Sequence, residues 1–324
     1  MQQRILVLGA NGFIGRKLVA ALVAADWAAP IAGVRIAPAA PQEDVEHRVV
    51  DATDEAAVAS ALIGVDAVVN CVVGKTIAIS QGARALFAAA SRASTTPRIV
   101  HLSSMSVYGN ASGLVDESAA LSADLGPYAA AKIQAEQLAA GYPSCVILRP
   151  GCEYGPTSPQ WSIRIADLLM ARRLGDLGAN GDGYCNLVHV DDVVAAILLG
   201  LQPQLKSAVF NLSTPDPPTW NEYLIRYGRL LKAVPIKRIS QRRLKIETKI
   251  LGPALKILEL GLEAAKLGKL RTPPPIPPSM ARLMRQEIKL DVQRAEQTLG
   301  IRWKSLDAGM EETADWYLAR NHGS

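Results

Sequence analysis

A tyrosine and a lysine four positions apart, Tyr128 and Lys132, form the pair in this 324-residue chain best placed to do chemistry. Positions i and i+4 share one face of a helix, so the phenol and the ammonium are expected to project together. An ammonium beside a phenol favours the phenolate and lowers the pKa of the phenol toward the range of a general acid–base. A Tyr-x3-Lys pair alone is common and mostly structural, so its weight depends on its surroundings.

Serines precede this pair along the chain. The segment 101–109, His-Leu-Ser-Ser-Met-Ser-Val-Tyr-Gly, brings three of them to the end of an apolar run. A serine hydroxyl at a strand end can hydrogen-bond a substrate oxygen that the phenol protonates or deprotonates. The tyrosine, the lysine and one serine would together form a proton-handling site.

A glycine-rich loop near the N-terminus predicts a dinucleotide site. Gly9, Gly12 and Gly15 lie between an apolar run at 5–8 and an apolar-periodic segment at 13–24, a pattern that predicts a strand, a loop and a helix. Glycines there allow a tight turn and let backbone N–H groups approach a diphosphate at the positive end of the helix. The alternative is a turn that merely connects two elements, because three glycines alone are a weak pattern.

The elements that must position these residues alternate between strand-like and helix-like segments. Continuous apolar runs without polar alternation are typical of parallel strands buried on both faces by helices. The sequence therefore predicts an α/β protein with a doubly wound parallel (Rossmann) sheet, whose ligands lie at the carboxyl ends of the strands. The predicted strands are 5–8, 31–35, 48–50, 67–71, 98–103 and 144–149, and the predicted helices are 13–24, 54–63, 80–92 and 127–140.

A smaller, mostly C-terminal substrate lobe is expected beside this sheet. The predicted dinucleotide-binding domain comprises residues 1–150 and about 186–203, and the lobe comprises about 151–185 and 204–324. Later in the chain a further strand is predicted at 209–212, and Thr219 with Glu222 fits a capping box that opens a helix.

Composition sets the broad class of the protein. Apolar residues make up 49% of the chain, which is typical of a globular protein. No apolar run approaches the roughly 20 residues that cross a bilayer, and the N-terminus lacks a signal-peptide pattern, so a cytoplasmic location is expected. The four cysteines and four histidines show no metal-ligand spacing, so we expect neither disulfides nor a metal.

The positive charge is concentrated in one segment. The formal net charge is +5, yet residues 229–271 hold 12 Lys or Arg and only 3 acids. The basic character therefore belongs to that segment and not to the whole surface. We expect a small-molecule substrate and no nucleic-acid partner.

The end of the second predicted strand indicates which dinucleotide binds. An acid some 20 residues after the glycine loop suits NAD, whereas a basic residue suits the extra phosphate of NADP. This strand ends in Arg35, which favours NADP and leaves NAD open; the alternative is an ordinary surface arginine. Asp51, at the end of the third strand, could hold the adenine amino group or cap the next helix, as Asp54 could.

In this order, the motifs resemble those of the extended short-chain dehydrogenase/reductase family, also called the NAD-dependent epimerase/dehydratase family. The resemblance covers nearly the whole chain. It rests on the blocks Gly9-Ala10-Asn11-Gly12-Phe13-Ile14-Gly15, Ser103-Ser104-Met105-Ser106-Val107-Tyr108-Gly109, Tyr128-x3-Lys132, Leu148-Arg149-Pro150, Tyr154-Gly155-Pro156 and Val188-His189-Val190-Asp191-Asp192-Val193.

The resemblance implies a role for each residue of the site. Tyr128 would be the acid–base, Lys132 its partner that also holds the nicotinamide ribose, and Ser104 the hydroxyl that orients the substrate. Ser104 is preferred because it stands three residues before Val107, while Ser103 and Ser106 stay open. A homodimer through two helices of the sheet domain is expected from the resemblance alone. The cofactor-binding residues would be Gly9, Asn11, Gly12, Phe13, Ile14, Gly15, Arg35, Asp51 and Lys132.

Two departures from the family pattern concern the substrate. Members that act on nucleotide sugars usually carry an asparagine where this chain has Cys152, and an arginine just before the His-Val-Asp-Asp block, where 181–188 holds none. A bound diphosphate needs compensating donors, so both changes weaken the nucleotide-sugar hypothesis. His189 is expected to pack beneath the lobe, and Asp191 or Asp192 to cap a helix starting near Val193, and not to catalyse or to bind a metal.

The segment 245–270 is the most distinctive departure from compact members of the family. Its leucines recur at spacings of three and four between charged residues, and a proline-rich connector follows at 272–278. This pattern predicts a basic amphipathic helix. A lid over the substrate pocket or a subunit interface is favoured, because such stripes are usually core; the alternative is a weak contact with an anionic membrane surface.

Three functional hypotheses follow. The first is an NAD(P)-dependent oxidoreductase that uses the Ser-Tyr-Lys site for hydride transfer at a carbinol or carbonyl carbon of a small or hydrophobic substrate. The second is a nucleotide-sugar epimerase or dehydratase that recycles its cofactor. The third is a non-catalytic NADP-binding regulator, against which the intact Ser104, Tyr128 and Lys132 argue.

Overall fold

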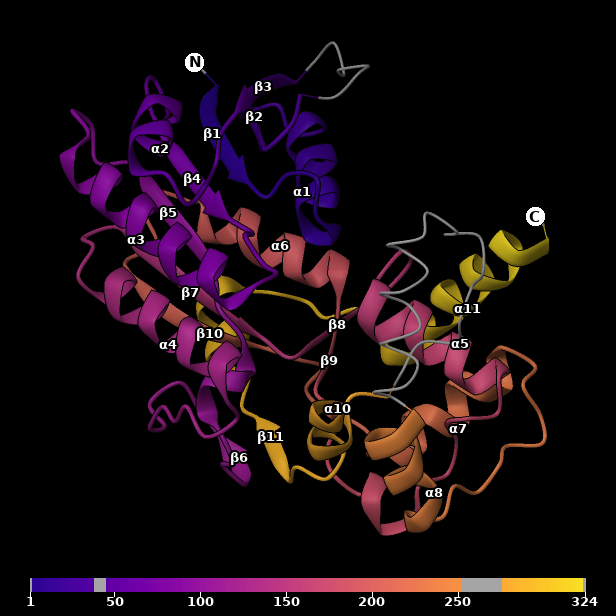
Figure 1. Cartoon of the computed structure of the whole chain (residues 1–324). Coiled ribbons are helices and arrows are strands. Elements are labelled where there is room, and N and C mark those ends of the chain that lie inside the picture. The colour runs from indigo at the N-terminus through magenta and orange to yellow at the C-terminus, as the bar shows by residue number, and fades with distance from the viewer. Residues whose placement is uncertain (1, 38–44, 252–275, 323–324) are drawn as a thin grey trace, which may run out of the picture.

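The computed structural model describes residues 2–37, 45–251 and 276–322. Its centre is a seven-stranded sheet in the order β10-β7-β5-β4-β1-β2-β3, in which neighbouring strands run parallel (Figure 1). This confirms the predicted doubly wound parallel sheet, and each predicted strand overlaps an observed one. The strands are β1 (Gln3–Leu8), β2 (Ala28–Val34), β3 (Glu46–Val49), β4 (Ala67–Asn70), β5 (Arg98–Leu102), β7 (Cys145–Pro150) and β10 (Ala208–Leu212).

Helices cover both faces of this sheet. One face carries α1 (Phe13–Val23) and α6 (Val190–Gly200), and the other carries α2 (Glu55–Ala61), α3 (Thr76–Arg92) and α4 (Pro127–Ala140). The residues of β1 alternate between the two apolar cores. Burial on both faces is the physical reason why these strands are apolar without polar alternation.

The strand β10 completes the sheet from a part of the chain that the sequence assigned to the lobe. It lies within 204–324, but it pairs with β7 from Ala208 opposite Val146 to Leu212 opposite Pro150. Phe210 is fully buried in the same core as α6. The sheet therefore extends to residue 212, and the rest of the domain division stays a prediction.

A smaller lobe lies beside the carboxyl ends of the strands (Figure 1). It has an apolar core of its own, to which five helices contribute side chains. These helices are α5 (Arg164–Met170), α7 (Trp220–Leu230), α8 (Gln241–Ile246), α10 (Pro278–Leu283) and α11 (Leu306–His322).

Short elements connect the sheet domain and the lobe. β8 (Cys152–Tyr154) follows β7 and pairs with β9 (Leu187–His189), which leads into α6. β6 (Gly113–Val115) pairs with β11 (Ile288–Leu290). Helical turns complete the connections: η1 (Met105–Tyr108), η2 (Pro159–Ile163), η3 (Gly178–Gly181) and η5 (Ala295–Leu299).

Two local sequence signals act as expected in the lobe. Thr219 and Glu222 form the predicted capping box, in which each side chain accepts from the backbone of the other residue at the start of α7. Gly300 ends η5 with a left-handed φ of 69°, a conformation that glycine adopts without strain.

Most of the predicted basic helix at 245–270 lies outside the described residues. The described start of that segment is the end of α8 and the turn η4 (Glu247–Leu251), where the buried Glu247 pairs with Arg173 at 2.5 Å. The hypotheses of a lid, an interface or a membrane contact stay predictions. Among the described helices, none is both long and apolar enough to cross a bilayer.

Candidate functional site

A cavity of about 580 Å³ lies between the sheet domain and the lobe. The sheet domain lines it with residues that follow β1, β4 and β5 and with the start of α4, and the lobe lines it with β8, η2 and α10. From β1 the chain continues to β2 and β3 on one side of the sheet, and then crosses to β4 on the other side of β1, so the strand order reverses there. Ligands of doubly wound sheets bind at such a reversal, so the cavity lies where the sequence predicts a ligand.

The glycine loop forms one side of the cavity. Gly9 has a φ of +83°, and a Cβ on Gly15 would lie 2.2 Å from the carbonyl oxygen of Gly9, so neither position accepts a side chain without movement. Gly12 precedes α1, whose first turn has neither a side-chain cap nor an acidic residue. Its first N–H groups are therefore available to a phosphate. Phe13 and Ile14 line the cavity next to these groups, so the loop fits a dinucleotide.

Four predicted cofactor residues lie outside the cavity lining: Gly9, Asn11, Arg35 and Asp51. Arg35 is exposed directly after β2. The pKa of the Asp51 carboxyl lies below its usual range, chiefly because of hydrogen bonds from Thr53 and to a smaller extent because of the Arg35 charge. One Asp51 oxygen accepts from the Thr53 N–H at 2.9 Å. The cap of α2 is Asp54, so Asp51 does not take that alternative role. Asn11 is exposed in the glycine loop.

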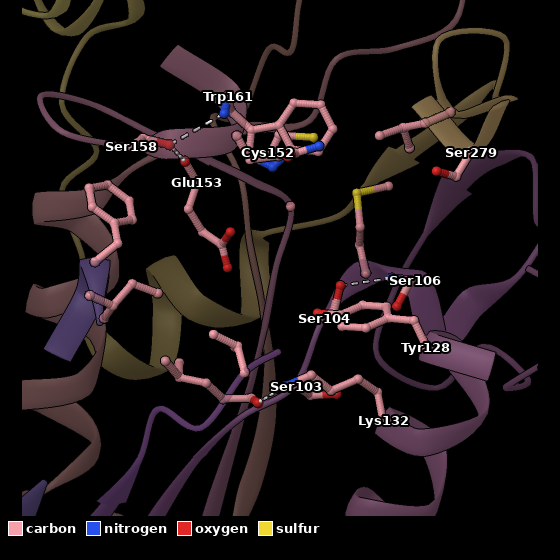
Figure 2. Close-up of a pocket in the computed structure, with 18 of the residues that line it drawn as sticks. Ser103, Ser104, Ser106, Tyr128, Lys132, Cys152, Glu153, Ser158, Trp161 and Ser279 are labelled. Atoms are coloured by element: carbon pink, nitrogen blue, oxygen red, sulfur yellow. Dashed lines mark hydrogen bonds between the residues drawn. The ribbon is translucent and has the colours of Figure 1, made fainter. Parts of the chain in front are cut away.

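Tyr128 and Lys132 share one face of α4 and both line the cavity (Figure 2). The buried Lys132 ammonium lies 6.0 Å from the centre of the Tyr128 ring and donates to the Leu102 carbonyl at 2.7 Å. Burial lowers the pKa of Lys132 to about 8. Burial, with help from Glu153, raises the pKa of Tyr128 to about 12, the reverse of the predicted lowering. The phenol is therefore protonated at neutral pH, because desolvation and the Glu153 charge outweigh the hydrogen bond with Ser104 that favours the phenolate.

The three serines of the 101–109 segment differ in their partners. Ser104 accepts from the Ser106 N–H at 3.2 Å, and its side chain hydrogen-bonds Tyr128, which moderates the rise in the pKa of that residue. Ser103 is buried and donates to Glu136. Within the described structure the Ser106 hydroxyl is buried without a partner. Ser104 is thus the serine that touches the phenol.

A buried polar network lies beneath these residues. Glu136, one turn after Lys132 on α4, pairs with Arg149 of β7 at 2.6 Å. Arg149 also donates to the Tyr108 hydroxyl at 2.8 Å, which in turn donates to Asn211 of β10 at 2.6 Å. The network ties α4, η1, β7 and β10 together and so fixes the position of Lys132. Glu136 could not be predicted from the sequence, because a single glutamate on a helix carries no distinctive pattern.

The lobe side of the cavity contains residues that the sequence argument did not predict. β8 contributes Glu153, whose carboxyl points into the cavity, and η2 contributes Trp161 (Figure 2). Burial raises the pKa of Glu153 to about 7, and the Lys132 charge opposes this rise. A charged residue inside an otherwise apolar strand was the available signal. From α10 the lining residues are Ser279, Met280, Arg282 and Leu283.

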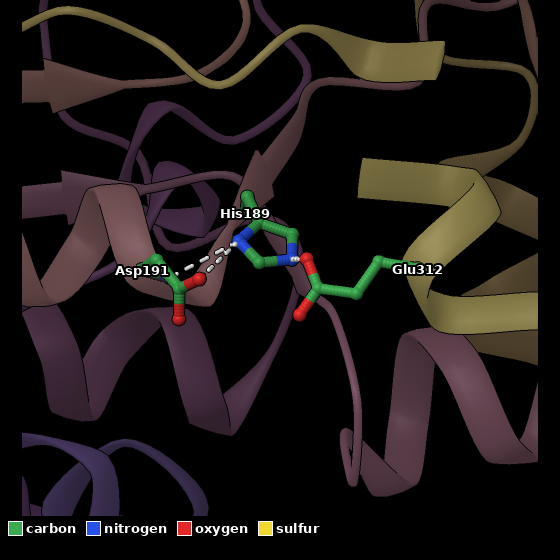
Figure 3. Close-up of side chains that lie close together, drawn as sticks. All are labelled: His189, Asp191 and Glu312. Carbon is green, nitrogen blue, oxygen red and sulfur yellow. Dashed lines mark hydrogen bonds and ion pairs between the residues drawn. The ribbon is translucent and has the colours of Figure 1, made fainter. Parts of the chain in front are cut away.

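A second cluster of polar side chains joins α6 to α11 away from the cavity (Figure 3). α6 begins at Val190, three residues earlier than predicted. Its cap is His189 and not an aspartate, because the His189 Nδ1 accepts from the Asp191 N–H at 3.3 Å. Lys304 lies 3.0 Å from Asp191 and 2.5 Å from Glu312. The ligand atoms of His189, Asp191 and Glu312 are close enough to hold a metal ion, but two ammonium groups already balance the two carboxylates, since Lys17 also pairs with Asp191 at 3.1 Å.

Comparison with protein families gives one match that covers most of the chain. The family model described as the NAD dependent epimerase/dehydratase family matches residues 5–213. No curated protein matches the sequence.

Solved structures with the same fold match nearly the full length. UDP-glucuronic acid 4-epimerase from Bacillus cereus, in complex with UDP-glucuronic acid and NAD, has 19% identity and a TM-score of 0.73 and covers 98% of this chain and 100% of its own. UDP-glucose 4-epimerase from Thermotoga maritima, with UDP-glucose, has 17% identity and a TM-score of 0.73, covering 99% and 100%. dTDP-glucose 4,6-dehydratase from Bacillus anthracis, in complex with NAD, has 16% identity and a TM-score of 0.74, covering 99% and 98%. At these identities the likeness concerns the fold.

Proposed function

Because the chain belongs to the NAD-dependent epimerase/dehydratase family, a family of enzymes, we propose that it transfers a hydride between NAD(P) and a carbinol or carbonyl carbon of a small molecule. The observation that carries this proposal is the shared cavity. Ser104, Tyr128 and Lys132 line it together with Gly12, Phe13, Ile14 and Gly15 of the glycine loop. A phosphate-binding loop and a proton-handling pair on one cavity are what such a reaction requires.

Each of the three side chains has its own role at the substrate oxygen. The Tyr128 phenol, whose pKa is raised to about 12, donates its proton to the oxygen of a carbonyl, or takes it back in the reverse direction. Ser104 hydrogen-bonds both Tyr128 and that oxygen, and so orients the substrate. The buried Lys132 ammonium favours a negative charge on the phenol as its proton leaves. The nicotinamide supplies the hydride chemistry when it is bound.

Replacing Tyr128 with phenylalanine tests the catalytic assignment. We expect Tyr128→Phe to slow hydride transfer by about a hundredfold or more, because positioned proton transfer contributes that much. Absorbance of the reduced cofactor is followed with panels of ketones, alcohols and UDP-sugars. Tyr184→Phe is the matched control, since Tyr184 does not line the cavity. Equal rates in Tyr128→Phe and the parent would remove the catalytic assignment and favour a non-catalytic regulator.

We further propose that NADP is the preferred cofactor. Arg35 supports this, because an exposed cation directly after β2 suits the extra phosphate of NADP. The affinities for NADPH and NADH are compared in the parent, in Arg35→Ala and in Arg302→Ala, an exposed arginine after η5. We expect Arg35→Ala alone to lose the preference for NADPH. A parent that prefers NADH contradicts the role of Arg35.

The proposed substrate is a small or hydrophobic carbonyl compound or its alcohol. The wall near Tyr128 supports it, because its side chains are mostly apolar and offer few donors to a charged diphosphate. These side chains include Met105, Leu125, Trp161, Met280 and Leu283.

A nucleotide sugar is the second candidate, and one observation favours it. α10 brings Arg282 and Ser279 to the cavity, and Gln286, which follows the end of this helix, also lines it. The Arg282 guanidinium suits a diphosphate. These donors come from another part of the chain than Cys152 and residues 181–188, the two departures from the family pattern that weaken the nucleotide-sugar hypothesis. Epimerisation of UDP-glucose or UDP-glucuronic acid without added cofactor would establish this candidate in place of the first.

A further inference from the structure

Glu153 is the one acidic residue among the described residues that line the cavity. It stands in the middle of β8, between Cys152 and Tyr154, which belong to the apolar core of the lobe. Side chains alternate along a strand, and the Glu153 side chain points the other way, into the cavity (Figure 2). Burying a carboxylate is unfavourable, so its presence here requires a compensating group.

The protein supplies that group only in part. The carboxylate is hydrogen-bonded by the backbone N–H of Glu153 itself, but among the described residues no other group donates a hydrogen bond to it and no cation lies within 4.0 Å of it. The Ser158 hydroxyl donates to the Glu153 backbone carbonyl at 2.8 Å and not to the carboxylate. The Lys132 ammonium donates to the Leu102 carbonyl instead. A structural ion pair therefore does not explain Glu153.

The groups that interact electrostatically with the carboxylate lie at the catalytic end of the cavity. They are Tyr128 and Lys132 on α4, Cys71 after β4 and Cys152 on β8. Glu153 raises the pKa of Tyr128, and Lys132 lowers the pKa of Glu153, although burial keeps the latter at about 7. The carboxylate is thus near the proton-handling residues and is ionised above neutral pH.

The proposed hydride transfer defines what this carboxylate faces. Phosphates belong at the glycine loop, and the oxygen of the reacting carbon belongs at Tyr128, so the nicotinamide ring has to lie between them in the same cavity. The ring is a cation when oxidised and neutral when reduced. In a poorly solvated cavity a carboxylate attracts the cation strongly and has little effect on the neutral ring.

We infer that Glu153 determines which oxidation state of the cofactor the protein binds more tightly, its carboxylate favouring the oxidised nicotinamide. This inference rests on the proposed function, because it requires a nicotinamide in this cavity. The enzyme then rests with oxidised cofactor. A hydride, with its two electrons, neutralises the ring when it arrives from a substrate carbon, and the carboxylate favours its return to the carbonyl carbon.

The experiment compares affinities for the two oxidation states. The full-length protein, freed of bound nucleotide, is titrated calorimetrically with NADP⁺, NADPH, NAD⁺ and NADH near pH 8, where Glu153 is ionised. We expect Glu153→Gln to lower the ratio of oxidised to reduced affinity by at least about tenfold, because a neighbouring opposite charge shifts an ionic equilibrium by one to three powers of ten. Both states share the phosphates and riboses, so a merely reshaped pocket leaves the ratio unchanged.

Two further variants and a change of pH complete the test. Glu153→Asp keeps the charge and retains the preference in the same direction. Glu311→Gln removes an exposed charge on α11 and leaves the ratio as in the parent. In the parent, lowering the pH to about 6 reduces the ratio as the carboxylate is protonated. A ratio unchanged by Glu153→Gln overturns the inference and leaves the proposed function standing, whereas failure of the parent to bind any of the four nucleotides overturns the proposed function.

Discussion

On the sheet side of the cavity the polar side chains beneath Lys132 are paired with one another, whereas on the lobe side Glu153 and Arg282 have no side-chain hydrogen-bond or ion-pair partner among the described residues. Both sides are close to Tyr128 and Lys132. The paired side holds Lys132 in one position through Glu136 and Arg149. The lobe side leaves the charges of Glu153 and Arg282 available to a ligand in the cavity.

This difference indicates what each side is for. A closed, buried network rigidifies the groups above it, which suits residues that must meet a reacting atom at a fixed distance. An unpaired charge in a cavity destabilises the folded protein until a ligand compensates it, and such groups cluster at functional sites. Under the proposed function, the sheet side therefore determines the reaction, and we propose that the lobe side selects the oxidation state of the cofactor and the substrate.

Breaking the network on the sheet side gives the largest expected effect. Arg149→Met leaves the Glu136 carboxylate buried without its cation, which is expected to lower the free energy of unfolding by about 3–5 kcal/mol. Urea denaturation of the parent and the variant measures this change. The double variant Arg149→Met/Glu136→Leu removes both charges and should recover part of the loss. A loss below about 1 kcal/mol would mean that the network is not the rigid element described.

The glycine loop gives the next largest effect. In Gly15→Ala the new Cβ would lie 2.2 Å from the Gly9 carbonyl oxygen, so the loop must move away from the phosphate site. We expect the affinity for NADPH to fall about 10- to 100-fold, which corresponds to the usual 1–3 kcal/mol for overpacking. Calorimetric titration measures it. Gly141→Ala is the control, because its Cβ would meet nothing closer than 3.7 Å. Unchanged affinity in Gly15→Ala would show that the loop tolerates a shift.

The motif residues of the sheet side could be predicted from the sequence, whereas Glu136 beneath them and the lobe side could not. Gly9, Tyr128 and Lys132 belong to short, ordered motifs on regular elements, so their spacing alone places them at one sheet edge. The direction of the Tyr128 pKa shift was wrong, because desolvation depends on packing that spacing does not reveal. Residues such as Arg282 lie more than 120 positions beyond Glu153, and only tertiary packing brings them to one cavity.

The stability of a Glu153 variant tests the same comparison, because the expected change in the free energy of unfolding has the opposite sign to that of Arg149→Met. The carboxyl of Glu153 has its pKa raised from 4.5 to about 7 in the folded protein, so the folded state holds the proton more tightly than the unfolded state. Its destabilising effect is absent well below pH 4.5, grows as the pH rises toward 7 and is constant above. Removing the carboxyl should therefore stabilise the protein increasingly as the pH rises from 4.5 to 7, and by a constant amount above that.

We expect Glu153→Gln to raise the free energy of unfolding by about 1–3 kcal/mol near pH 8, allowing for the part of the side chain that solvent in the cavity screens. Near pH 4 the difference should vanish. Urea denaturation at the two pH values is the measurement, with Glu311→Gln as the control for an exposed glutamate. A destabilised Glu153→Gln near pH 8 would mean that the carboxylate has a partner and that the two sides of the cavity do not differ.

The smallest expected effect on stability belongs to Arg282, and its effect on binding separates the two candidate substrates. Arg282 is exposed and, among the described residues, forms no ion pair, so Arg282→Met should change the free energy of unfolding by less than about 0.5 kcal/mol. Arg285→Met is the matched control, since Arg285 is also exposed but does not line the cavity. If the substrate is a hydrophobic carbonyl compound, Arg282→Met leaves its turnover within about twofold of the parent, because no anion faces the guanidinium. If UDP binds the parent and Arg282→Met loses that affinity about tenfold while Arg285→Met does not, the guanidinium holds a diphosphate, and the nucleotide sugar replaces the carbonyl compound as the substrate.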